Sequence, residues 1–62
     1  MNKQQIINEC NEITSFINEC NRIRNSTDDS DLVVLAIAAH DKAVRARATL
    51  LKAYLKWEAN NE

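Results

Sequence analysis

Apolar side chains recur along the first half of the chain with the spacing of an amphipathic helix. Five of them are separated by four, three, four and three residues: Ile6, Cys10, Ile13, Ile17 and Cys20. These steps match the seam of a coiled coil. Three more residues widen the seam into the broader apolar face of a bundle helix: Ile7, Phe16 and Ile23. The pattern predicts a helix over residues 2–25.

Polar residues at the ends of this segment support the same bounds. Asn2 followed three residues later by Gln5 is typical of a capping box at a helix N-terminus. Asn25 tolerates the left-handed conformation that ends many helices, so we expect the helix to end there. Residues 26–31 then predict a turn, in which Asp28 and Asp31 form the capping pair of the next helix.

The second helix is predicted to run from about residue 29 to about residue 59. Its most regular apolar stripe again has steps of four and three residues: Leu32, Ala36, Ala39, Ala43, Ala46, Leu50, Ala53 and Trp57. Small residues allow helices to approach closely, so we expect this stripe to face the first helix. Because the turn is short, the helices should be antiparallel neighbours, with Ile17 near Ala39 and Ile13 near Ala43.

A second apolar set lies beside that stripe: Val33, Ile37, Val44, Leu51 and Leu55, with Val34, Leu35 and Tyr54 around it. One neighbouring helix cannot cover both sets. We therefore predict an all-α fold, an antiparallel two-helix hairpin that assembles as a homo-oligomeric four-helix bundle, with a dimer favoured. The predicted oligomer core comprises Ile6, Cys10, Ile13, Ile17, Cys20, Val33, Ala36, Ile37, Ala39, Ala43, Val44, Ala46, Leu50 and Leu51.

Length and composition favour the same assembly. A chain of 62 residues forms one domain at most, and domains below about 70–80 residues usually need disulfides, a metal or oligomerisation. Two cysteines and one histidine cannot by themselves complete a four-ligand zinc site, so no metal or other cofactor is expected. Cys10 and Cys20 are interpreted as buried small apolar residues, with intermolecular disulfides or redox sensing as the alternative.

The charge balance limits the partners. A net charge of −1 gives no overall attraction to nucleic acids or anionic membranes. No apolar run approaches the roughly 20 residues that cross a bilayer. The first residues lack the apolar core of a signal peptide, so a cytoplasmic location and no membrane partner are expected.

Candidate catalytic groups are sparse. The chain has no glycine for a phosphate-binding loop and no local Ser/His/Asp or Cys/His arrangement, so no enzyme is predicted. His40 and Arg47 share a stripe with the second apolar set and are interpreted as polar residues at an oligomer seam. Arg47 should fall near Glu9 and form an ion pair. Alternatively, His40 or Arg47 could hold a small anionic ligand, such as a nucleotide, in a groove between subunits.

A basic stripe follows one side of the second helix: Lys42, Arg45, Lys52 and Lys56. Such stripes usually serve solubility, with local pairs such as Asp41–Arg45. The functional alternative is contact with the phosphates of a nucleic acid, with the basic side doubled by dimerisation.

In size and plan the chain resembles the Rop-type plasmid copy-number regulators, short helical hairpins that dimerise into four-helix bundles. The resemblance covers the plan of the whole chain and rests on no shared motif, so it assigns no functional residue. It implies a hairpin dimer and, as one alternative, RNA binding.

The predicted function is that of a small regulatory interaction module, as phages and plasmids encode. It would self-associate and bind an unidentified protein. The predicted contact region is the end of the second helix, where aromatic residues offer anchors: Tyr54, Leu55 and Trp57.

Overall fold

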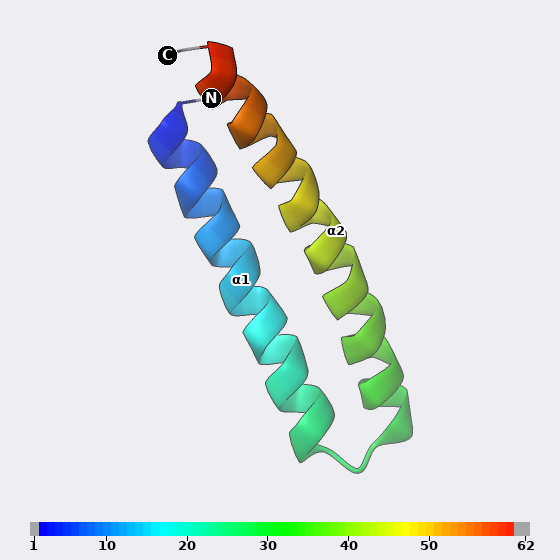
Figure 1. The fold of residues 1–62 in the computed structure, drawn as a ribbon. Helices are drawn as coiled ribbons and strands as arrows, with labels where there is room; N and C mark the ends of the chain where they lie inside the picture. Colours follow the sequence, from blue (N-terminus) through cyan, green and yellow to red (C-terminus); the bar gives the residue numbers. More distant parts are fainter. Residues whose placement is uncertain (1, 61–62) are drawn as a thin grey trace.

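A computed structural model describes residues 2–60, and over this range the chain forms two helices. Helix α1 spans Lys3–Ser26 and helix α2 spans Ser30–Asn60. The two helices run side by side and antiparallel, with the start of α1 and the end of α2 at one end of the molecule (Figure 1). The chain measures 49 × 15 × 14 Å. The predicted all-α hairpin is confirmed, and each helix bound lies one residue later than predicted.

The capping box at the start of α1 is also confirmed. The Gln5 backbone N–H donates to the Asn2 side-chain oxygen at 2.9 Å, and the Asn2 N–H donates to the Gln5 side-chain oxygen at 2.9 Å. These reciprocal bonds satisfy two N–H groups that have no partner within the helix. The start of α1 is therefore determined by four consecutive residues of local sequence.

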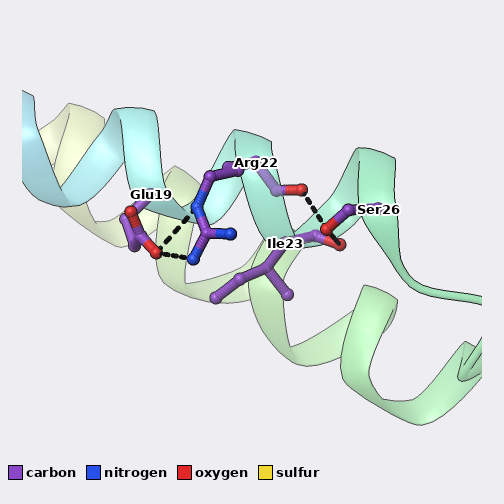
Figure 2. Close-up of polar contacts among 4 residues, drawn as sticks. All are labelled: Glu19, Arg22, Ile23 and Ser26. Carbon is purple, nitrogen blue, oxygen red and sulfur yellow. Dashed lines mark hydrogen bonds and ion pairs between the residues drawn. The ribbon is translucent and has the colours of Figure 1, made fainter.

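The prediction that Asn25 ends α1 is wrong. Asn25 is helical, and no residue of the described range has a positive φ. The helix instead ends where Thr27 becomes extended, with φ −117° and ψ 147°. The Ser26 hydroxyl donates back to the Arg22 carbonyl oxygen at 2.7 Å (Figure 2), a local side-chain bond that serine commonly makes within a helix.

Residues 27–29 connect the helices, a shorter turn than predicted. Asp29, rather than Asp28, caps α2, because its carboxylate accepts from the N–H groups of Asp31 at 3.0 Å and Leu32 at 3.3 Å. The Thr27 hydroxyl oxygen accepts from the Asp29 N–H at 3.2 Å and holds the turn. Since α2 begins at Ser30, the capping position falls one residue later than the sequence pattern indicates.

The core of the hairpin is thin. Five of the described residues are buried: Ile6, Ile17, Cys20, Ala36 and Ala43. No side chain in the described range is completely enclosed. Other members of the predicted core are half-buried in the hairpin, namely Cys10, Ile13, Val33, Ala39, Val44 and Leu50, whereas Ile37, Ala46 and Leu51 are exposed. A single hairpin therefore covers only part of the predicted core.

The predicted inner stripe of α2 is only partly correct. Five of its eight residues are buried or half-buried, namely Ala36, Ala39, Ala43, Leu50 and Trp57, but Leu32, Ala46 and Ala53 are exposed. In their place α2 turns four other residues toward α1: Val33, His40, Arg47 and Tyr54. Larger side chains remove more apolar surface from water than alanines do, so this rotation of α2 buries more area against α1.

Candidate functional site

Both flanks of the hairpin carry exposed apolar side chains. The first flank, here the Phe16 face, presents Phe16, Leu32 and Leu35 together with the half-buried Ile23. The second, here the Leu51 face, presents Ile37, Leu51 and Leu55 together with the half-buried Val44. Leu35 and Leu55 are the most exposed of these, at 65% and 66%.

Helical geometry places these two faces on opposite sides of the molecule. Both helices are right-handed and run antiparallel, so each flank of α1 meets one particular flank of α2. Phe16 and Ile23 of α1 fall on the same side as Leu32 and Leu35 of α2. On the other side, Thr14 of α1 accepts a hydrogen bond from Arg47 of α2. The hairpin is thus a two-helix layer with an apolar surface on each side.

Arg47 joins the two helices, although not as predicted. Its Nη1 donates to the Thr14 hydroxyl oxygen at 3.2 Å, and Thr14 in turn donates to the Cys10 carbonyl oxygen at 2.9 Å. Glu9 is exposed, and no ion pair joins it to Arg47 within residues 2–60. The Arg47 guanidinium therefore has a neutral partner in the hairpin, on the side of the Leu51 face.

His40 lies half-buried on α2 beside an exposed carboxylate. Its Nδ1 is 3.4 Å from Asp41 Oδ1. A shallow depression of about 340 Å³ is lined by these two residues with Val44 and Arg45. The Asp41 carboxylate repels a bound anion at this position, which counts against the predicted anionic ligand. His40 and Arg47 lie one heptad apart on α2, and of these two residues only Arg47 forms a hydrogen bond to α1.

The end of α2 forms an aromatic pair. The rings of Tyr54 and Trp57 stack with centroids 6.4 Å apart and planes 17° apart, and Lys3 Nζ lies 6.0 Å from the Tyr54 ring centroid. Hydrogen bonding to Glu58 raises the pKa of Tyr54 above its ordinary value. Tyr54 and Trp57 are half-buried, whereas Leu55 points out on the Leu51 face. The predicted contact residues therefore extend around the end of the hairpin.

The predicted basic stripe is fully on the surface. Lys42, Arg45, Lys52 and Lys56 are all exposed, and none forms an ion pair with a carboxylate within residues 2–60. Arg45 donates from Nε to the backbone oxygen of Asp41 at 3.4 Å, in place of the predicted carboxylate pair. This part of α2 carries cations that are available to an anionic group on another molecule.

The acidic side chains of α1 differ in their partners. Glu19 forms an ion pair with Arg22 (Figure 2). Hydrogen bonding from Arg22 lowers the pKa of the Glu19 carboxyl and raises the pKa of Arg22. Glu9 and Glu12 are exposed and have no such cation within the described range. These two carboxylates remain available for contacts outside the hairpin.

The cysteines and the other potential metal ligands are not arranged as a disulfide or a metal site within residues 2–60. Cys10 is half-buried and Cys20 is buried, and both are free thiols. No group of three or more potential ligands that could hold a metal ion occurs within residues 2–60. Over the same range, neither helix combines the length and apolar character that a bilayer crossing requires.

Comparison with known proteins gives no match: no protein-family model, no curated protein and no solved structure matches the chain. The function is therefore inferred from the geometry and chemistry of the hairpin.

Proposed function

We propose that this protein is a non-enzymatic helical module of the regulatory type, which associates with itself and binds a protein partner. The observation that carries the proposal is the distribution of apolar side chains. Within residues 2–60, seven large apolar residues are exposed: Phe16, Leu32, Val34, Leu35, Ile37, Leu51 and Leu55. Isolated exposed leucines are ordinary on a protein surface, but six of these seven lie on two continuous flanks.

Self-association follows from the thinness of the core. The five buried residues include two alanines and a cysteine, which together remove little apolar surface from water. Domains of this size are marginal without additional burial. A second copy against one flank doubles the number of helices around a shared core, as in four-helix bundles.

A partner protein follows from the second flank. Because the Phe16 face and the Leu51 face are on opposite sides of a two-helix layer, one two-fold interface covers only one of them. The other keeps exposed leucines beside the aromatic pair of Tyr54 and Trp57. An apolar stripe with aromatic neighbours is the kind of surface on which interface hot spots form.

The oligomeric state tests the first half of the proposal. Sedimentation equilibrium between about 1 µM and about 1 mM should show a dimer or a larger assembly. A folded monomer over the whole range, with the circular dichroism of two helices, contradicts self-association.

Affinity capture with matched variants tests the second half. A protein that co-purifies with the wild-type chain from cells that encode it should be lost with Trp57→Ala and with Leu55→Ser. Val34→Ser is the matched control, because Val34 is exposed to 64% and lies on α2 outside both faces. All variants must retain the helicity and oligomeric state of the wild type. Equal capture by all of them excludes this contact surface.

Nucleic-acid binding is a second candidate, favoured by one observation: the four exposed cations of α2 lack carboxylate partners within residues 2–60. Binding to mixed RNA and DNA should then weaken steeply as the salt concentration rises. Lys52→Glu combined with Lys56→Glu should weaken it further. Binding that is absent at low salt, or unchanged in that variant, removes this candidate.

A further inference from the structure

The Phe16 face differs from the Leu51 face in what α1 contributes to it. Phe16 is the one large apolar residue of α1 that is exposed within the described range, and it lies on the Phe16 face with Ile23. On the opposite flank, α1 presents the exposed amides of Asn11 and Asn18. Burying unpaired amides costs free energy, so a symmetric interface across both helices fits the Phe16 face better.

Charges of opposite sign border the Phe16 face along its two edges. On α1, Glu9 and Glu12 lie seven and four residues before Phe16 and therefore on the same side of the helix. On α2, Lys42 and Lys56 lie seven and twenty-one residues after Leu35 and therefore on the same side of the helix. None of the four has an ion-pair partner within residues 2–60. The face thus has an acidic edge along α1 and a basic edge along α2.

The two edges are matched in position along the hairpin. The hydrogen bond between Thr14 and Arg47 shows which parts of α1 and α2 are level with one another. By this register, Glu9 and Lys56 lie within about one helical turn of the same level. A second hairpin packed on the Phe16 face can therefore place carboxylates opposite cations without an axial shift between the two hairpins.

Two symmetric arrangements of a second copy are available, and the charges distinguish them. With both turns at the same end, α1 of one copy lies over α2 of the other, so each acidic edge meets a basic edge. With the turns at opposite ends, α1 lies over α1 and α2 over α2, so like charges meet. Like charges placed opposite one another oppose association and thereby select the orientation.

The size of the face is compatible with a stable dimer. A surface 49 Å long and 15 Å wide has a projected area of about 735 Å². Specific interfaces bury about 800 Å² per partner. Covering the whole face would therefore supply an interface of ordinary size, with Phe16, Leu32 and Leu35 as its apolar centre.

We infer that the Phe16 face binds a second copy of this chain with the two turns at the same end, so that the acidic edge with Glu9 and Glu12 of each copy meets the basic edge with Lys42 and Lys56 of the other. This inference rests on the proposed self-association and adds its face and its orientation. It leaves the Leu51 face of each copy exposed on the outside of the four-helix bundle, available to the protein partner.

A charge-reversal pair tests the inference. Variant one carries Glu9→Lys and Glu12→Lys, and variant two carries Lys42→Glu and Lys56→Glu. Each alone should dimerise at least about tenfold more weakly than the wild type, because like charges then meet at both edges. An equimolar mixture should recover wild-type affinity as a heterodimer, because acid meets base again at both edges. Arg45→Glu with Lys52→Glu is the matched control and should dimerise like the wild type, because these two residues lie one heptad apart on α2 and Arg45 lies beside Val44 of the Leu51 face.

The outcomes separate the inference from the function on which it rests. A wild-type dimer whose affinity is unchanged in both variants, or variants that weaken without recovery on mixing, overturns the assigned face and orientation but leaves self-association standing. A wild-type monomer at every concentration overturns both.

A distance measurement checks the orientation independently. Spin labels on Asp28→Cys, in a chain that carries Cys10→Ser and Cys20→Ala, report the separation of the two turns. Turns at the same end should give a distance below about 25 Å, since packed helices lie about 10 Å apart. Turns at opposite ends of a 49 Å hairpin should give about 40 Å or more, and that result overturns the inference.

Discussion

Helix α1 buries large side chains and exposes amides, whereas α2 buries small side chains and exposes large ones. On α1, Ile6 and Ile17 are buried while most asparagines are exposed. On α2, Ala36 and Ala43 are buried while Leu35 and Leu55 are exposed. The difference shows that α1 is nearly satisfied by one neighbouring helix. The apolar surface of α2 extends over more of its circumference, as in a helix that contacts several neighbours.

The largest expected effect comes from shortening a buried side chain of α1. Ile17→Ala should lower the free energy of unfolding by about 2–4 kcal/mol, because it leaves a cavity where Ile17 is only 6% exposed. Val34→Ala on α2 should change it by less than about 0.5 kcal/mol. Urea denaturation followed by circular dichroism measures both. Similar losses in the two variants would contradict the contrast between the helices.

Enlarging a buried residue of α2 should have the next largest effect. Ala43→Leu places extra atoms where α1 packs closely, and should cost about 1–3 kcal/mol of unfolding free energy. Ala38→Leu makes the same change at an exposed position of α2 and should be nearly neutral. Thermal melts of the two variants give the comparison. An Ala43→Leu chain as stable as the wild type would show that the small residues of α2 do not set the helix separation.

The N-terminal caps of the two helices differ. The cap of α1 is a reciprocal pair of hydrogen bonds, whereas the side-chain cap of α2 is the Asp29 carboxylate alone. Asp29→Ala should cost about 1 kcal/mol, because the N–H groups of Asp31 and Leu32 lose their acceptor. Asp28→Ala should have no measurable effect, since Asp28 is exposed and makes no capping bond. The same denaturation assay distinguishes them. Equal losses at the two positions would contradict the assignment of the cap.

The smallest expected effect is a pH dependence at the open end of the hairpin. The folded state raises the pKa of Tyr54 above its ordinary value of 10.0, so the fold favours the protonated phenol. The resulting stability is fully present below the unfolded-state pKa and is lost as the pH rises through the folded-state pKa. The melting temperature of the wild type should therefore fall slightly more between pH 9 and about 11 than that of Tyr54→Phe. Parallel curves for the two chains would contradict this assignment.

Local sequence determined the hairpin itself and the cap at the start of α1. The alternating four- and three-residue spacing of the apolar seam predicts α1, and Asn2 with Gln5 predicts its first turn, because a capping box needs only four consecutive residues. The exposed cations of α2 could also be predicted from their spacing. Asp28 and Asp29 could not be told apart in this way, since several short polar side chains in succession can each cap a helix.

The tertiary structure decided which side of α2 faces α1. Helix α2 carries two apolar stripes with helical spacing, and either could pack against α1. One stripe is regular and consists mainly of small side chains, whereas the other has larger side chains but is interrupted by His40 and Arg47. The pairing of Arg47 with Thr14 joins residues 33 positions apart, so no local pattern could reveal it. Sequence periodicity fixes the angles between side chains on one helix but not the rotation of that helix against its neighbour. The rotation depends on how much surface each orientation buries, and that quantity exists only when both helices are in place.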